Sequence, residues 1–136
     1  MERHANGRFR PDASEIASAR RFVRSSLLSW GLGEQVPSLE LAVSELVTNA
    51  MVHGEGEVEV QLTARGSHMR LEVLDQGRHA ATPAQREIGP GERGGWGLRL
   101  VEELSDSWGA VTGPTETRVW MERDVAGTGG DLDDQR

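Results

Sequence analysis

Residues 41–50 read Leu41-Ala42-Val43-Ser44-Glu45-Leu46-Val47-Thr48-Asn49-Ala50, and their pattern is the strongest structural signal in the chain. At about 100° per residue, the apolar side chains of this segment fall on one face of a helix. Pro37 suits the first turn of such a helix, and Gly54 suits its end. The pattern therefore predicts a helix from Pro37 to His53 that packs one face against a core.

Three polar side chains form a line along this predicted helix. They are Glu45, Asn49 and His53, each four residues after the one before, and the line follows the edge of the apolar face. A polar row at that position costs stability unless partners satisfy it, and it is well placed to face a cleft. From the helix alone two interpretations stay open: a boundary glutamate with an incidental asparagine, or part of a functional site.

The rest of the chain shows the periodicities of helices and strands. Helical spacing of apolar residues predicts two further helices, over residues 14–28 and 98–104. Period-two alternation predicts four strands, over residues 57–62, 69–74, 108–112 and 117–121. Consecutive strands form hairpins, and this order of elements predicts an α+β fold. We expect a two-layer sandwich with the helices on one face of a largely antiparallel or mixed sheet.

The length of the chain limits its domain organisation. A chain of 136 residues suits a single domain. We expect the globular part to cover residues 8–125. It would lie between a flexible N-terminus at residues 1–7 and a disordered acidic tail at residues 126–136.

Composition excludes several kinds of chemistry. The chain has no Cys, which excludes a disulfide scaffold, a thiolate zinc site and a cysteine nucleophile. It has no Lys either, so all 15 cationic side chains are Arg and a P-loop is impossible. The net charge of −7 argues against a nucleic acid as the main partner. Without a signal-peptide core or an apolar run of about 18 residues, we expect a cytoplasmic protein that enters no membrane.

Two more segments lie at the ends of the long loop between the predicted hairpins. Asp75-Gln76-Gly77 places a carboxylate at a strand end, where it is a good acceptor for an exocyclic amino group, but Asp-x-Gly is also a common turn. Gly94-Gly95-Trp96-Gly97-Leu98 runs into a helix, where free backbone N–H groups favour phosphate. A plain hinge would use the same glycines. Neither segment identifies a site on its own.

Taken together and in this order, the three segments resemble one known family. The segment around Glu45 and Asn49, the segment Asp75-Gln76-Gly77, and the segment Gly95-Trp96-Gly97-Leu98 look like the N, G1 and G2 boxes of the histidine-kinase-like ATPase superfamily. Within it, the chain is most similar to the anti-sigma-factor serine/threonine kinases that work by partner switching. The resemblance covers residues 8–125 and implies the histidine-kinase-like ATPase fold.

The resemblance implies ATP and Mg²⁺ as cofactors and gives individual residues a role. Glu45 would be the general base that takes the proton from a hydroxyl of the substrate. Asn49 would bind Mg²⁺ and, with it, the nucleotide. The adenine side of the site would consist of Asp75, Gly77 and Thr117, with His53 beside the nucleotide. The phosphate side would consist of backbone N–H groups of Gly95, Gly97 and Leu98 and the guanidinium of Arg93 or Arg86.

The resemblance also implies a reaction and partners. The protein would transfer the γ-phosphate of ATP to a Ser or Thr of an antagonist protein and would sequester a sigma factor. Its basic first helix would lie near a dimer or partner surface, which allows a homodimer. Relatives often continue the G1 box as Asp-x-Gly-x-Gly, whereas Arg78 and His79 follow Gly77 here. An alternative therefore stays open: a non-catalytic protein-binding regulator with a structural or absent nucleotide.

Overall fold

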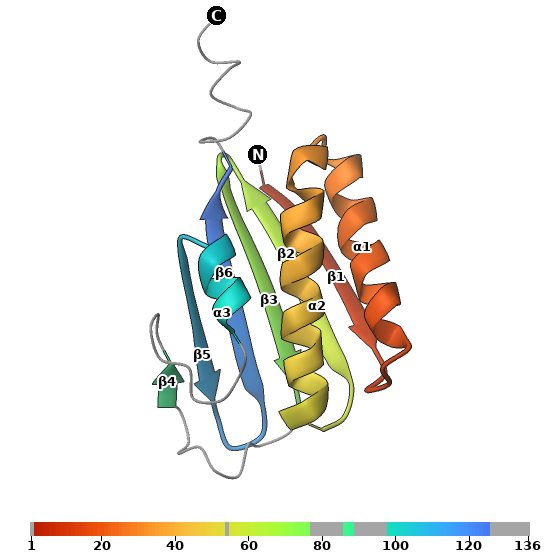
Figure 1. The fold of residues 1–136 in the computed structure, drawn as a ribbon, viewed down its shortest axis with the longest axis vertical. Coiled ribbons are helices and arrows are strands. Elements are labelled where there is room, and N and C mark those ends of the chain that lie inside the picture. Colours follow the sequence, from red (N-terminus) through yellow and green to blue (C-terminus); the bar gives the residue numbers. More distant parts are fainter. Residues whose placement is uncertain (1, 54, 77–85, 89–97, 126–136) are drawn as a thin grey trace, which may run out of the picture.

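The computed structural model describes residues 2–53, 55–76, 86–88 and 98–125, which form two layers (Figure 1). One layer is a six-stranded sheet in the order β1-β2-β3-β6-β5-β4, and all of its neighbouring strands are antiparallel. The strands are β1 (Glu2–Phe9), β2 (Val58–Arg65), β3 (His68–Asp75), β4 (Arg86–Ile88), β5 (Ser107–Thr112) and β6 (Thr117–Asp124). The helices are α1 (Glu15–Ser29), the 3-10 helix η1 (Gly33–Gln35), α2 (Val36–His53) and α3 (Arg99–Leu104).

The three α-helices form the second layer and cover the same face of the sheet (Figure 1). The central helix, α2, contacts α1 on one side, α3 on the other, and β3 beneath it. The predicted α+β sandwich is therefore confirmed, and its sheet is antiparallel throughout the described strands. No helix in these ranges combines the length and the apolar character needed to cross a membrane.

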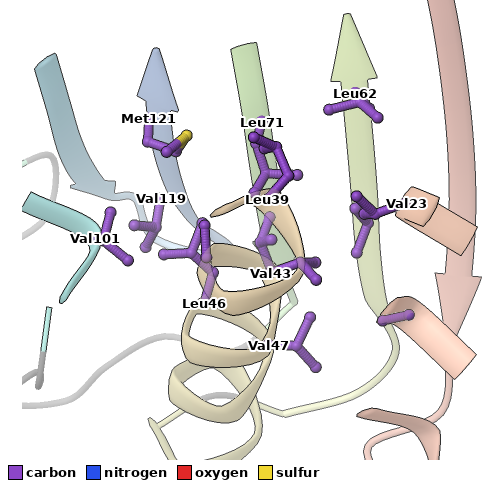
Figure 2. Packing of buried hydrophobic residues seen from close by; sticks show 14 of the residues in the cluster. Val23, Leu39, Val43, Leu46, Val47, Leu62, Leu71, Val101, Val119 and Met121 are labelled. Atoms are coloured by element: carbon purple, nitrogen blue, oxygen red, sulfur yellow. The ribbon is translucent and has the colours of Figure 1, made fainter. Parts of the chain in front are cut away.

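The hydrophobic core lies between α2 and the sheet. Figure 2 shows the apolar side chains of α2 pointing toward those of the strands: Leu39, Val43, Leu46 and Val47 on the helix, and Leu62, Leu71, Val119 and Met121 on the sheet. Burying one side chain of this size contributes about 1.5–3 kcal/mol, so the core determines which face of α2 meets the sheet. The polar line of the helix consequently lies at the edge of that contact.

The elements expected from periodicity are all present, with bounds that differ by at most three residues. The first hairpin turns at Gly66, whose φ of 60° is in the left-handed region that glycine adopts without strain. The second hairpin joins β5 to β6, and the N–H of Gly113 donates to the carbonyl oxygen of Glu116 across its loop. Hydrophobic patterning and turn chemistry were thus sufficient to locate the central elements.

The expectation of a flexible N-terminus over residues 1–7 is wrong for the residues described. Glu2 to Phe9 form the edge strand β1, which pairs with β2 along its whole length. Backbone hydrogen bonds hold this strand, and among its residues only Phe9 is buried, in an edge-on ring contact with Phe22. An edge strand with so few buried side chains leaves no period-two pattern in the sequence.

The long loop also differs from the expectation, because residues 86–88 form the short strand β4 beside β5. Three residues are too few to show alternation in the sequence. The expected disordered tail at residues 126–136 lies outside the described residues. Val125, the last described residue, follows β6, and its N–H donates to the carbonyl oxygen of Ser67.

Candidate functional site

Three polar residues lie side by side across the ends of three neighbouring strands. Asp75, the last residue of β3, pairs with Thr117, the first residue of β6, and Thr117 also pairs with Thr112, the last residue of β5. Directly opposed residues of antiparallel strands present their side chains on the same face, about 5 Å apart. The three side chains therefore form a continuous polar row, which we call the strand-end row.

The strand-end row belongs to the face of the sheet that the helices cover. Its side chains are almost fully buried, with exposed fractions of 3% for Asp75, 0% for Thr117 and 2% for Thr112. Along β3 and β6 they continue the alternation of the core residues Val73 and Val119. The row lies at the end of the sheet where α2 also ends (Figure 1). A carboxylate and two hydroxyls are thus buried on the helix-covered face, on strands that contact α2 and α3.

The helix α2 contributes two further polar side chains near this end. Asn49 is buried, with 7% of its surface exposed, and its amide nitrogen Nδ2 has no hydrogen-bond partner among the described residues. Glu45, one turn earlier, is half-buried, and no hydrogen bond or ion pair holds its carboxylate within the same part of the chain. His53 is the last residue of α2. The i, i+4 spacing therefore places a buried amide and an accessible carboxylate on one edge of the helix.

A backbone hydrogen bond joins the connection after α2 to the residue that follows β3. The N–H of Gln76, the residue after Asp75, donates to the carbonyl oxygen of Glu55 over 3.1 Å. Gly56 has a φ of 73°, and a Cβ built on it would lie only 2.8 Å from Oε1 of Gln76. The positive φ favours glycine at this position, and the absence of a side chain leaves room for the side chain of Gln76.

Leu98, which the sequence analysis assigned to the phosphate side, is a core residue. It is 1% exposed and directly precedes α3, and its carbonyl oxygen accepts the N–H of Glu102 over 2.9 Å. The structure thus anchors the start of α3 in the core. Arg86 lies in β4, where its backbone pairs with Thr112. The remaining phosphate-side and adenine-side candidates, Gly77, Arg93, Gly95 and Gly97, lie outside the described residues.

The donor set of the strand-end row suits a planar heterocycle. A buried carboxylate accepts a hydrogen bond from an exocyclic amino group, and hydroxyls can donate to a ring nitrogen or accept from it. On α2, the amide nitrogen Nδ2 of Asn49 is a further hydrogen-bond donor that no group of the described chain engages. In the described ranges, no group of three or more His, Cys, Asp or Glu side chains could hold a metal ion.

The structure places Asp75 opposite Thr117, and it places Glu45 and Asn49 on one edge of α2, the helix that contacts β3. Two further residues belong to this description. Thr112 joins the strand-end row, and Gly56 permits the close contact with Gln76. Thr112 could have been found from the sequence, because it and Thr117 are the residues that flank the four-residue connection between the predicted strands 108–112 and 117–121. No pattern in the sequence predicts the role of Gly56, since that role depends on its φ and on a contact with Gln76, which is distant in the sequence.

Comparison with protein families agrees with this arrangement. A family model described as the histidine kinase-like ATPase domain matches residues 9–123, which extend from the end of β1 to β6. No curated protein matches the chain. The matched region includes α2, the strand-end row and α3, and it supports the binding of a nucleotide, ATP. The chain belongs to the histidine kinase-like ATPase domain family.

Proposed function

We propose that this protein is a protein kinase that binds Mg-ATP beside the strand-end row and transfers the γ-phosphate to a Ser or Thr of a partner protein. The observation that carries the proposal is the pairing of Asp75 with Thr117, both buried, at the end of the sheet where α2 ends, since α2 carries Asn49 and Glu45 in its C-terminal half. A binding site for a base and a candidate catalytic carboxylate thus occupy one end of one domain.

The nucleotide is held by groups on two layers. Asp75 accepts a hydrogen bond from the amino group of adenine, and the Thr117 hydroxyl supports the same edge of the base. The amide oxygen of Asn49 supplies a ligand of the type that Mg²⁺ accepts, and the phosphates and water complete its coordination. When bound, Mg²⁺ neutralises charge on the phosphate oxygens. The start of α3 at Leu98 lies on the phosphate side.

Glu45 is the residue for the proton transfer. Its carboxylate accepts the proton of the incoming Ser or Thr hydroxyl, or orients that hydroxyl, as it attacks the γ-phosphate. Because no group of the described chain engages this carboxylate, it remains available to a substrate that approaches from solvent. Binding of a nucleotide alone needs no carboxylate at this position, which favours the kinase over a purely binding role.

The partners follow from the resemblance to anti-sigma-factor kinases. The phosphorylated protein is an antagonist, and the sequestered protein is a sigma factor. The protein acts in the cytoplasm, and the Arg-rich α1 lies near a dimer or partner surface. Two of its guanidinium groups, on Arg20 and Arg24, lie 3.7 Å and 3.1 Å from the carboxylate of Glu40 on α2. This ion-pair cluster leaves Arg21 as a further exposed cation on α1.

Calorimetric titration with ATP, with and without Mg²⁺, tests the nucleotide site. We expect micromolar binding that requires Mg²⁺. No binding at millimolar ATP would contradict the proposal and would favour the alternative, a protein-binding regulator without a nucleotide.

Two substitutions on α2 then separate binding from chemistry. Glu45→Ala should leave the Kd for Mg-ATP within about threefold and should abolish phosphotransfer. Asn49→Ala should weaken Mg-ATP binding itself, by about tenfold or more, a change of about 1.4 kcal/mol. Glu34→Ala, which removes an exposed carboxylate before the other end of α2, is the matched control and should change neither quantity. Equal losses in both assays for Glu45→Ala and Asn49→Ala would refute this division of roles.

A further inference from the structure

We infer that the hydroxyl group of Thr112 is a third polar contact for the nucleobase, a specificity-determining group beside Asp75 and Thr117. The inference rests on the proposed function, because it requires a base to bind at the strand-end row. It concerns a residue outside the three boxes that suggested the site. Its basis is the position of Thr112 and the state of its hydroxyl.

The position follows from the register of the sheet. Thr112 and Thr117 are opposite each other in the β5–β6 hairpin, as Thr117 and Asp75 are between β6 and β3. The side chain of Thr112 is therefore on the helix-facing side and next to that of Thr117. The alternation along β5 agrees, since Trp108 and Ala110 on the same side are buried in the core.

The hydroxyl of Thr112 is buried without a hydrogen-bond partner in the described chain, as are Nδ2 of Asn49, Oγ of Ser44 and Nε1 of Trp108, but of these only Thr112 lies in the strand-end row. Thr112 is 2% exposed, and its Oγ1 has no hydrogen-bond partner among the described residues. A buried hydroxyl without a partner destabilises the fold, because it has lost water and gained nothing in exchange. Valine has nearly the same shape and a comparable preference for strands, and it would avoid this cost. The hydroxyl is best explained by a partner that arrives with the ligand.

The chemistry of the row identifies the class of that ligand. A hydroxyl both donates and accepts, so Thr112 can serve a ring nitrogen or an amino group on the edge of a purine. Asp75 acts only as an acceptor when ionised and therefore selects an edge that carries an N–H donor. With Thr112, the row has two hydroxyls beside one carboxylate, which matches an edge of alternating donors and acceptors such as that of adenine.

The test compares Thr112→Val, Thr112→Ser and the wild-type protein in two measurements, the Kd for Mg-ATP by calorimetry and the Tm of the nucleotide-free protein. We expect Thr112→Val to raise the Kd about five- to tenfold while the Tm stays the same or rises. Thr112→Ser, which keeps the hydroxyl, should bind within about twofold of the wild type. Thr63→Val makes the same chemical change on β2, where the hydroxyl lies 3.3 Å from Nδ1 of His4, and should leave the Kd unchanged.

Each other outcome is decisive. If Thr112→Val binds ATP as tightly as the wild type, the hydroxyl does not contact the base, and the inference fails while the proposed function stands. If Thr112→Val lowers the Tm of the free protein or does not fold, the hydroxyl has a partner without nucleotide, and the inference fails again. If the wild-type protein itself does not bind ATP, the proposed function and the inference fail together.

Discussion

On the outer face of the sheet, the buried carboxylate of Glu72 lies between two Arg side chains of the same chain, whereas on the inner face the buried hydroxyl of Thr112 has no partner in the described chain. The two residues are similarly buried, at 6% and 2% exposure. Glu72 and Asp75 are only three positions apart on β3, yet their side chains belong to opposite faces. The comparison therefore separates polar groups that the fold uses from polar groups that it leaves for a ligand.

The outer face satisfies its charges internally. Nε of Arg70 lies 3.4 Å from Oε1 of Glu72, and Nη1 of Arg118 lies 2.9 Å from Oε2. The Arg70 guanidinium also pairs with Glu122 and lies 4.7 Å from the ring centroid of Trp120. Burial opposes the effect, but the hydrogen bond to Glu116 and the nearby charge of Glu72 raise the pKa of Arg118 above its usual value. This network stabilises the sheet without a partner molecule.

The inner face of the sheet, by contrast, holds a buried polar group that has no partner in the described chain. The amide nitrogen of Asn49 and the hydroxyl of Thr112 are buried and unpaired in the described chain, and both lie at the end of the molecule that holds Asp75. Native proteins pair most buried polar groups. Ser44 Oγ and Trp108 Nε1 also lack a hydrogen-bond partner in the described chain, so the position of Thr112 in the strand-end row, and not the missing partner alone, points to a ligand. The two faces should therefore respond differently to the same substitution.

The largest expected effect belongs to Asp75→Asn. The amide presents N–H donors where the amino group of the base needs an acceptor, so we expect the Kd for ATP to rise about 100-fold, a change of about 2.7 kcal/mol. Calorimetry measures this change, and circular dichroism checks the fold. Glu72→Gln, which neutralises a carboxylate on the same strand but on the outer face, is the matched control and should leave the Kd unchanged. Comparable losses of ATP affinity in both variants would remove the distinction between the faces.

The second-largest expected effect is a decrease in the free energy of unfolding of the same Glu72→Gln variant. Removing the charge leaves Arg70 and Arg118 without their buried counter-charge, but both are partly exposed and water can solvate them. We therefore expect a decrease of about 1–2 kcal/mol in the free energy of unfolding, below the cost of breaking a fully buried pair. Urea denaturation measures it. An unchanged midpoint would show that the charge of Glu72 contributes nothing to the stability of the fold.

How far the sequence could predict these features depends on the kind of interaction. The helix α2 was predictable because its apolar period and Pro37 agree, and the position of Glu45 and Asn49 on one edge follows from that period alone. The pairing of Thr112 with Thr117 was predictable too, since a short hairpin fixes its own register. The pairing of Asp75 with Thr117 could not be derived from pattern, because β3 and β6 are neighbours only through the crossing of the chain.

The features that could not be predicted depend on the backbone or on contacts between distant elements. Strand β1 is held by its ladder with β2, and its exposed side chains carry no signal apart from Phe9. The φ of 73° at Gly56 and its contact with Gln76, the residue after β3, depend on how distant segments of the chain pack together. The roles of Glu45 and Asn49 came from resemblance to a family, because a polar row on a helix edge is compatible with a structural explanation.

The smallest expected effect concerns a polar group that is neither buried nor left for a ligand. Oδ1 of Asp12, which is exposed before α1, accepts the N–H of Ser14 over 3.0 Å. Hydrogen bonds from Ser14, with a contribution from the charge of Arg10, hold the pKa of Asp12 below its usual value of 3.8. A lowered pKa in the folded state means that the stabilisation is complete well above pH 3.8 and is lost as the pH falls through the folded value.

We expect Asp12→Ala to lower the Tm by no more than about 2 °C at pH 7 and to match the wild type in strong acid. Asp12→Asn, which keeps an acceptor oxygen, should lose less than Asp12→Ala. A difference between Asp12→Ala and wild type that persists undiminished at pH 2 would show that Asp12 acts through packing rather than through its charge, and the group would then belong with the structural residues of the outer face.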